Sequence, residues 1–441
     1  MCYKYREDNC IKLPGPELPD KGSFGSILAS DEYDLFTCAP QAFLDSYGVV
    51  NKETNKKPYV TGACYRMEHN QFEVEAMFNM SSLQTNLYGN RFAGAYNKWF
   101  RGSVYGVSGV VMDRTLIIGA PLQKDKLTLN KTDIYSGTVV MIKNKNIFEV
   151  DPTKANYALQ NKDWQTGVIH KLVGETVSTG VFTTDGSSQV IIGAPKADSL
   201  HGKVYICGEC FTPGQQRNVD LPDGKNLEVS GDNVGDRFGK SVAGCDITGD
   251  GIDDLIVGAP FSSLDSRFSF DTGKIYIYVT KNNKLEKGIP SDISPGQDSI
   301  GGRFGSAVEC LGDIDNDAFK DILVGAPYYK QHGAVFVFYG SLLGLQVERK
   351  PQIILAEDIS FKPKGFGVSL KSVSQKMISI GAHLSNQVAL LQARSVVRFH
   401  PKSQMFTVDG IFWLKIFTRI QMYLRILIIT FVFLTFCVLK F

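Results

Sequence analysis

The sequence predicts an all-β fold built from similar β-rich units, as in a β-propeller. A closing signal, Gly-Ala-Pro or a close variant, recurs at residues 38–40, 119–121, 193–195, 258–260, 325–327 and 381–383. A Phe-Gly pair opens several units, at residues 24–25, 238–239, 304–305 and 366–367. Helix signals are almost absent from this region. A chain of 441 residues is too long for one ordinary core unless it is built from repeats.

Each unit is expected to contain about four strands, the usual content of a propeller blade. Beyond the closing signals, short β-rich runs begin at Gly137, Gly202, Gly273 and Gly333. Two units have irregular openers, a looser one at residues 100–102 and a divergent one at residues 177–180. A series of β-sandwiches is the alternative, but it would not require the same opener and closer throughout.

An acidic loop within residues 237–260 predicts a metal site. Oxygen atoms stand at regular alternate positions in this loop, which we name loop I (residues 246–254). The candidate ligands are the side chains of Asp246, Thr248, Asp250 and Asp254 and the main-chain carbonyl of Ile252. A tight loop of this kind can wrap Ca²⁺, which takes roughly six to eight oxygen ligands. A polar surface turn between two strands is the alternative.

The same pattern returns in residues 303–327 and predicts a second calcium site. We name this stretch loop II (residues 313–321). Its candidate ligands are the side chains of Asp313, Asp315, Asp317 and Asp321 and the main-chain carbonyl of Phe319. Ala318 replaces the turn glycine Gly251, and a left-handed conformation is costly for any residue with a Cβ. Loop II is therefore expected to be tighter in geometry or weaker in binding.

Composition argues against two other classes of protein. The formal net charge is only +2 and no basic stripe is present, so there is no argument for nucleic-acid binding. The six histidines show no metal-ligand spacing, and no Ser/His/Asp arrangement stands out. The chain is therefore not expected to be an enzyme.

The units resemble the β-propeller of integrin α subunits, whose FG…GAP repeats carry loops of the DxTxDGxxxD type. The resemblance covers residues 1–400 and includes the junctions between parts. Residues 1–13 are similar to the end of the first blade, Cys38 to Tyr65 to the second blade, and residues 389–399 to the exit from the last. The resemblance implies a seven-bladed propeller, of which most of blade one is missing from this chain.

The implied organisation has the end of blade 1 at residues 1–13, blades 2–7 at residues 14–394, the start of a thigh-like linker at residues 395–410, and a hydrophobic segment at residues 411–441. No signal peptide follows Met1. Because an integrin α subunit must be exported, the chain is expected to be N-terminally incomplete. A cytosolic protein is the competing interpretation.

The cysteines and sequons suit an exported protein. The resemblance implies disulfides between Cys2 and Cys10 and between Cys38 and Cys64, which form in oxidising compartments. Sequons at Asn79 and Asn130 are candidate glycosylation sites.

Four further cysteines receive structural interpretations. For Cys207 and Cys210, a lone CxxC, a local disulfide or two hairpin thiols are favoured over redox chemistry or half of a zinc site. Cys245 and Cys310 precede the two acidic loops and are expected to be buried thiols.

The resemblance implies a cell-adhesion receptor subunit at the plasma membrane, with its propeller outside the cell. Such a chain pairs with an integrin β subunit, binds extracellular matrix or cell-surface ligands, and signals across the membrane. Calcium in loops I and II would be structural, on the face opposite the ligand site. At the hub, family members can grip a basic side chain of the β subunit with aromatic residues. This chain has Lys240, Ser306 and Val368 there, and Lys240 would repel a cation unless it extends into solvent.

The hydrophobic segment admits three interpretations. Its longest uncharged run, residues 426–439, is shorter than the roughly 20 residues of a membrane-spanning helix. Spanning is possible if the count begins at Met422 and Arg425 snorkels. The three interpretations of the segment are the end of a truncated product, a membrane tether, and a buried core helix.

Two other functions are alternatives to the receptor. One is a truncated non-signalling or secreted FG-GAP propeller. The other is the propeller part of a phospholipase-type enzyme, which would carry zinc ligands in a helical N-terminal domain. The sequence contains no such domain.

Overall fold

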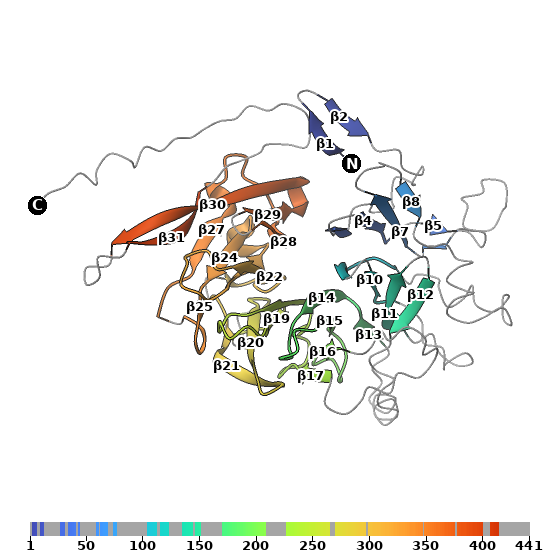
Figure 1. Cartoon of the computed structure of the whole chain (residues 1–441), viewed down its shortest axis with the longest axis horizontal. Helices are drawn as coiled ribbons and strands as arrows, with labels where there is room; N and C mark the ends of the chain where they lie inside the picture. The colour runs from blue at the N-terminus through green and yellow to red at the C-terminus, as the bar shows by residue number, and fades with distance from the viewer. Residues whose placement is uncertain are drawn as a thin grey trace, which may run out of the picture.

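Six sheets, each built on four antiparallel strands, stand side by side in a ring (Figure 1). We name them blades A to F in chain order. The computed structural model describes residues 2–6, 9–12, 27–30, 34–40, 43–44, 59–60, 62–68, 74–76, 104–112, 115–122, 135–143, 146–150, 170–208, 226–264, 270–296, 299–346, 348–374, 377–399 and 406–413. The predicted all-β propeller is confirmed, and the described residues contain no α-helix.

The first three blades lie within residues 27–230. Blade A comprises β3 (Ile27–Ser30), β4 (Asp34–Ala39), β7 (Ala63–Glu68) and β8 (Val74–Ala76). Blade B comprises β9 (Gly109–Met112), β10 (Thr115–Ala120), β11 (Tyr135–Lys143) and β12 (Asn146–Val150), and β13 (His170–Val173) pairs in parallel with β11. Blade C comprises β14 (Thr176–Gly180), β15 (Gln189–Ala194), β16 (Lys203–Cys207) and β17 (Asn226–Ser230).

The other three blades complete the described ring. Blade D comprises β18 (Ser241–Cys245), β19 (Asp254–Ala259), β20 (Lys274–Lys281) and β21 (Lys284–Ile293). Blade E comprises β22 (Ala307–Gly312), β23 (Asp321–Ala326), β24 (Ala334–Phe338) and β27 (Gln352–Leu355). Blade F comprises β28 (Phe366–Ser374), β29 (Met377–Ala382), β30 (Gln387–Phe399) and β31 (Phe406–Trp413).

Short elements complete the list. The hairpins are β1 (Cys2–Arg6) with β2 (Asn9–Lys12), β5 (Phe43–Leu44) with β6 (Tyr59–Val60), and β25 (Gly340–Ser341) with β26 (Gly344–Leu345). The 3₁₀ turns are η5 (Tyr329–Gln331), η6 (Ala356–Asp358) and η7 (His383–Ser385).

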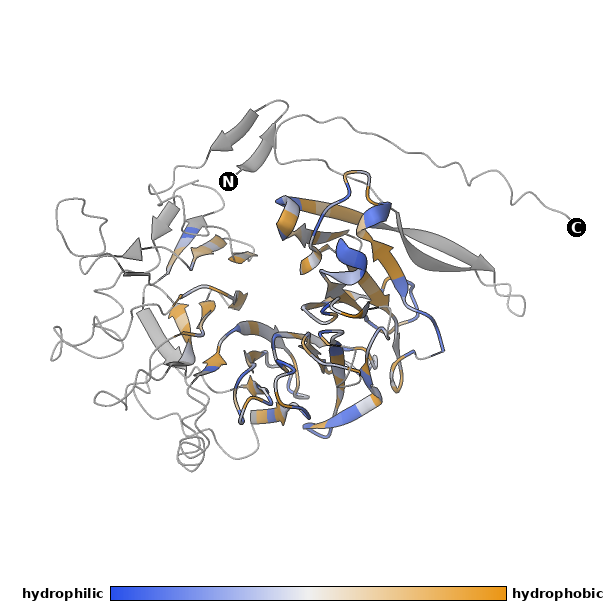
Figure 2. Cartoon of the chain, turned by 180° about the vertical axis from the view of Figure 1, so that it is seen from behind, coloured by the Kyte–Doolittle hydropathy of each residue, from blue (hydrophilic) through white to orange (hydrophobic). Residues whose placement is uncertain are grey.

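In blades B to E the second strand is apolar on both faces because a neighbouring blade covers each face. In β10, β15, β19 and β23 every residue is buried, which fits sequences such as TLIIGA and DLIVGA. By contrast, β21 at the outer side of blade D has many exposed residues. Figure 2 shows the resulting concentration of hydrophobic residues within the blades.

One backbone hydrogen bond recurs in successive blades. The amide of the opening glycine donates to the carbonyl of the closing glycine, at 3.1 Å from Gly239 to Gly258 and at 3.0 Å from Gly305 to Gly325. The same bond identifies the openers of blades B and C. It joins Gly106 to Gly119 at 2.9 Å and Gly174 to Gly193 at 3.0 Å.

The sequence-based openers at residues 100–102 and 177–180 are therefore wrong. The openers are Tyr105-Gly106 in blade B and Val173-Gly174 in blade C. Both glycines have the positive φ found at Gly239, 86° for Gly106 and 82° for Gly174. The left-handed glycine therefore defines the opener better than an aromatic residue before it does.

Adjacent blades also meet through the closing glycines. A Cβ atom on Gly119, Gly193, Gly258 or Gly325 would overlap the carbonyl oxygen of the opening glycine in the next blade. The glycines that begin each third strand approach the backbone of the next opener in the same way, for example Gly273 against Phe304. At these positions adjacent blades contact each other directly through their backbones, without intervening side chains.

The C-terminal part of blade F uses residues that were expected to lie beyond the propeller. Strand β31 pairs with β30 from Gln392 opposite Trp413 to Phe399 opposite Phe406. It includes residues 406–410 of the expected linker and residues 411–413 of the hydrophobic segment, and the end of β30 includes residues 395–399 of the linker. The alternating sequence FTVDGIFW is compatible with such a strand. Residues 414–441 lie outside the described residues, and within those described no helix is long and apolar enough to cross a membrane.

Replacing Gly258 by alanine is expected to destabilise the propeller by about 3 kcal/mol, because blades D and E would have to separate to admit the methyl group. Gly296→Ala is the matched control, since a Cβ there meets nothing within 4 Å and only its φ of 85° is unfavourable. The control substitution should lower the free energy of unfolding by about 1 kcal/mol. Thermal and urea unfolding measure the difference, and equal losses for both variants would contradict the blade-contact explanation.

Candidate metal site

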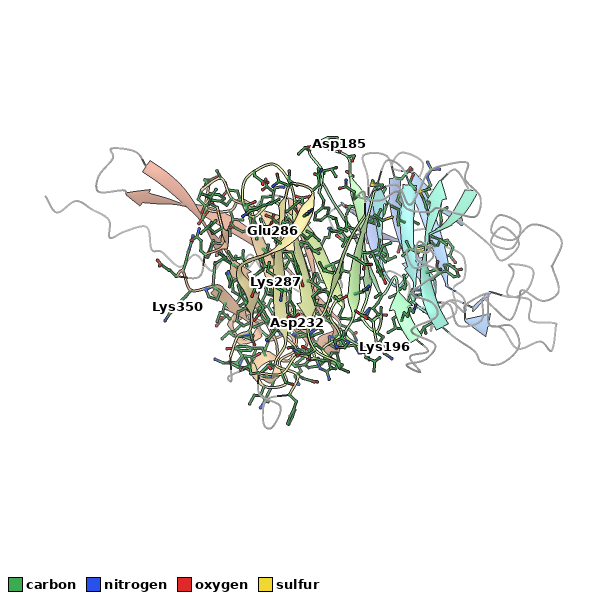
Figure 3. The ribbon with its side chains drawn as sticks, turned by 90° about the horizontal axis from the view of Figure 1, so that it is seen from below. Asp185, Lys196, Asp232, Glu286, Lys287 and Lys350 are labelled. Atoms are coloured by element: carbon green, nitrogen blue, oxygen red, sulfur yellow. A yellow bond between two sulfur atoms is a disulfide. The ribbon has the colours of Figure 1, made fainter. Side chains whose placement is uncertain are left out.

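Loops I and II occupy equivalent places in adjacent blades. Loop I joins β18 to β19 in blade D, and loop II joins β22 to β23 in blade E. Figure 3 shows Asp185, from the corresponding loop of blade C, at one end of the blades and Lys196, which follows a closing glycine, at the other. The acidic loops therefore lie at the end of the blades opposite the closing glycines.

The two loops fold into the same turn. In loop I, Asp246 accepts hydrogen bonds from the amides of Asp250 and Gly251, at 3.0 and 3.1 Å. The amide of Ile252 donates to Asp250 Oδ1 at 2.9 Å.

Loop II repeats these bonds residue by residue. Asp313 accepts from the amides of Asp317 and Ala318, at 3.1 and 2.9 Å, and the amide of Phe319 donates to Asp317 Oδ1 at 3.1 Å. The shared residue spacing therefore produces a shared backbone conformation, which brings the alternating acidic side chains to one turn.

The last aspartate of each loop fixes the loop to its own blade. Asp254 Oδ2 accepts from the amides of Ile247 and Thr248 and from the Thr248 hydroxyl, each at 3.1 Å. Its Oδ1 accepts from the amide of Thr280 at 2.9 Å. Burial raises the pKa of Asp254 to about 7, although these hydrogen bonds act in the opposite direction.

Asp321 has the same role in loop II. Its oxygens accept from the amides of Ile314 and Gly340, at 2.9 and 3.1 Å. Burial, reinforced by the nearby charges of Asp315 and Asp317, raises the pKa of Asp321 to about 8. Asp254 and Asp321 thus contribute to the loop as acceptors of backbone hydrogen bonds.

Loop II contains a cluster of three carboxylates suited to a cation. Oxygens of Asp313, Asp315 and Asp317 lie within 4.8 Å of one another. Asp315 is only 3% exposed, and its buried Oδ1 has no hydrogen-bond partner. Burial and the charges of Asp315 and Asp313 raise the pKa of Asp317 to about 6. Because a buried carboxylate oxygen without a partner is unfavourable, these residues fit a hard cation such as Ca²⁺.

Among the candidate-ligand side chains, loop I differs from loop II at one position. Thr248 replaces the aspartate found at 315, and its hydroxyl donates to Asp254. No second group of three clustered acidic, histidine or cysteine ligands occurs within the described ranges. The predicted ligands of loop I therefore share one turn but offer fewer charges.

Two residues beside loop II were not identified from the sequence. Gln346 Nε2 donates to Asp317 Oδ2 at 3.0 Å, and Arg349 Nη1 pairs with Asp315 Oδ2. The guanidinium carbon of Arg349 lies 3.2 Å from the centre of the Tyr339 ring. No local signal reveals these contacts, because Arg349 is 34 positions away from Asp315 along the chain.

Blades D and E are joined covalently next to the loops. Cys245 and Cys310 form a disulfide with a Cα–Cα distance of 5.3 Å, so their interpretation as thiols is wrong. The error arises because first strands of adjacent blades converge, bringing together residues that are far apart in sequence. Noncovalent contacts also link the loops, since the amide of Lys320 donates to the carbonyl of Asp246 at 3.2 Å and its Nζ lies 3.4 Å from Asp253 Oδ1.

The corresponding loops of blades C and F differ from this pattern. Asp185 accepts hydrogen bonds from Thr183 and Ser187, which lower its pKa to about 2. In blade F, Lys371 Nζ instead forms an ion pair with Glu309 at 2.8 Å.

Lys240, which the resemblance places at the hub, forms an ion pair with Glu175. Its charge is therefore partly balanced within the chain. Ser306 donates to the carbonyl of Arg303 at 2.7 Å, and Val368 follows the opener of blade F.

The remaining cysteines and sequons fall in different parts of the chain. Cys38 and Cys64 form a disulfide between β4 and β7, and Cys207 is also disulfide-bonded. The side chains of Cys2 and Cys10 and both sequon residues, Asn79 and Asn130, lie outside what the structure describes.

Loop geometry predicts opposite effects for two exchanges between the loops. Gly251 has a φ of 86° and Ala318 a φ of 75°, and a Cβ on Gly251 would meet nothing within 4 Å. Gly251→Ala should lower stability by about 1 kcal/mol, through the backbone alone. Ala318→Gly should raise it by on the order of 0.5 kcal/mol, because relief of the left-handed strain at Ala318 outweighs the greater freedom that glycine has in the unfolded chain. Unfolding in a chelator measures both, and changes of the same sign would refute this account of the turn.

A repeat family and several known proteins are similar in sequence to this chain. A family described as FG-GAP repeat matches residues 238–278, from the opener of blade D into its third strand. Integrin alpha pat-2 of Caenorhabditis briggsae is 27% identical over 434 aligned residues, covering 91% of this chain and 32% of that protein. Integrin alpha-4 of Xenopus laevis is 32% identical over 232 residues, covering 51% and 21%.

Integrin alpha-IIb of Homo sapiens is 33% identical over 238 residues, covering 51% of this chain and 21% of that protein. The chain thus spans about a third or less of the length of these relatives. A solved structure titled "Structure of Dos1 propeller" covers 88% of this chain at a TM-score of 0.40 and 9% identity, a likeness too low to support an argument about fold.

Proposed function

We propose that this chain, a homologue of integrin α subunits with an FG-GAP repeat over part of their length, is the propeller of a cell-adhesion receptor subunit. The observation that carries the proposal is the similarity to integrin alpha pat-2 over 91% of this chain. In this role the propeller pairs with an integrin β subunit at the cell surface and binds a matrix or cell-surface protein, contributing to signalling across the membrane. It performs no catalysis. The hairpin of β1 and β2 is the end of a seventh blade.

Calcium in loops I and II is proposed to stiffen the propeller. Asp313, Asp315 and Asp317 would bind the cation in loop II, and Asp246, Thr248 and Asp250 would do so in loop I. The unpartnered Oδ1 of Asp315 supports a cation in loop II, since a divalent ion would satisfy it. The ion would replace repulsion between neighbouring carboxylates with attraction and hold both ends of the turn together.

The position of the loops supports separate roles for the two ends of the propeller. Calcium at the loop end would stabilise the blades, which leaves the opposite end for the β subunit and ligand. The Glu175–Lys240 ion pair gives the hub a polar character. Pairing at this hub would therefore use contacts other than aromatic ones at Lys240, Ser306 and Val368.

Calorimetric titration of the full chain with Ca²⁺ is expected to reveal two sites. Asp250→Ala should abolish the site in loop I and Asp317→Ala the site in loop II, because each removes a carboxylate from one turn. Asp185→Ala is the matched control, a carboxylate in the equivalent loop of blade C. At a hundredfold excess over Kd, each site should stabilise the fold by about 2.7 kcal/mol. Saturable binding that survives both substitutions would refute these assignments.

Receptor function is tested by co-expression with integrin β subunits, followed by affinity capture and surface labelling. A stable complex at the cell surface is the expected result. A folded chain that binds calcium but captures none of the co-expressed β subunits would instead indicate a non-signalling propeller.

A further inference from the structure

Arg349 lies beside the acidic cluster but belongs to a different segment of blade E. It stands between β26 and β27, and its guanidinium contacts Asp315 on one side and the Tyr339 ring on the other. The side chain of Asp315 is 2% exposed and that of Arg349 is 25% exposed. Ion pairing and ring contact therefore fix a cation at the edge of loop II.

The charges of the two loops suggest why this cation is present. Loop I has three aspartates among its candidate ligands, whereas loop II has a fourth because Asp315 replaces Thr248. When only the candidate-ligand side chains are counted, adding the charge of Arg349 gives loop II the same sum as loop I; Asp253 in loop I and Lys320 in loop II lie outside this count and pair with each other. Within the described part of the chain, no lysine or arginine forms an ion pair with Asp246, Asp250 or Asp254. Arg349 thus pairs with the one candidate-ligand carboxylate that loop I lacks.

Arg349 pairs with only one of the two carboxylate oxygens of Asp315. Its guanidinium pairs with Oδ2, while Oδ1 remains buried and without a hydrogen-bond partner. A divalent ion that binds Oδ1 would lie on the same carboxylate as the guanidinium. Two cations on the same carboxylate repel each other, and partial burial reduces the screening of that repulsion by water.

We propose that Arg349 is a built-in counter-cation of loop II, which stabilises Asp315 when no metal is bound and competes with a divalent cation for that carboxylate. This inference rests on the proposed calcium binding. It makes loop I the site that fills first as calcium rises. It also makes loop II less dependent on calcium for its folded conformation.

Arg349→Gln tests the proposal, because it removes the charge while keeping a side chain that can pack on Tyr339. Titration of the full chain with Ca²⁺, in an Asp250→Ala background that leaves loop II as the remaining site, should show affinity increased about tenfold by loss of the repulsion. Arg349→Lys should keep the original affinity to within about threefold, because it retains the charge. Lys350→Ala is the neighbouring control, and should change neither affinity nor stability.

A second measurement uses no metal. In a chelator, Arg349→Gln should lower the melting temperature, and adding Asp315→Asn should restore most of the loss by removing the uncompensated charge. Unchanged or weaker calcium binding by Arg349→Gln would overturn competition, and weaker binding would make Arg349 a residue that positions Asp315 for the metal.

Calcium binding by the chain with native Arg349 separates failure of the competition proposal from failure of the proposed calcium function. If the chain with native Arg349 binds calcium in loop I and loop II, but Arg349→Gln has no effect, only the competition is refuted. Absence of calcium from both loops in every variant would refute the calcium proposal and the competition together. Binding in loop II only after Arg349→Gln would support competition in its strongest form.

Discussion

Close approach of one backbone to the next is the constraint on which the ring of blades depends. Each closing glycine in blades B to E faces the carbonyl of the following opener with no room for a Cβ atom. In blades B to E, the amide of the opening glycine donates a hydrogen bond to the carbonyl of the closing glycine of its own blade. The same few glycines therefore organise a blade internally and set its position against the next. This dual use explains why a short signal recurs while the intervening sequence varies.

The acidic loops are built at the other end of this framework and depend on it. Strands β18 and β22 are brought together by blade packing, and the loops at their ends become neighbours. Asp254 and Asp321 then fix each loop to its own blade through backbone amides. The remaining acidic groups are left at the turn, where their mutual repulsion favours a cation, either an ion or a side chain.

The sequence was sufficient to predict the repeated β architecture and the acidic turns, because both depend on patterns within a few residues. It was insufficient where the structure depends on contacts between repeats. Openers Tyr105-Gly106 and Val173-Gly174 are defined by glycine conformation and hydrogen bonding, which the missing Phe concealed. Likewise, the contact of Arg349 with Asp315 requires the fold of a whole blade, because the segment between β26 and β27 that carries Arg349 is 34 positions away from Asp315 in the sequence.

The disulfide between Cys245 and Cys310 changes what a break in the chain would do. The two cysteines are separated by 65 positions, and the segment between them contains nearly all of blade D after its first strand. Proteolytic cleavage within that segment would leave both fragments covalently connected through β18 and β22. Such a nick would become visible as two polypeptides only after reduction, and the joined fragments would keep the register between blades while the covalent connection remained.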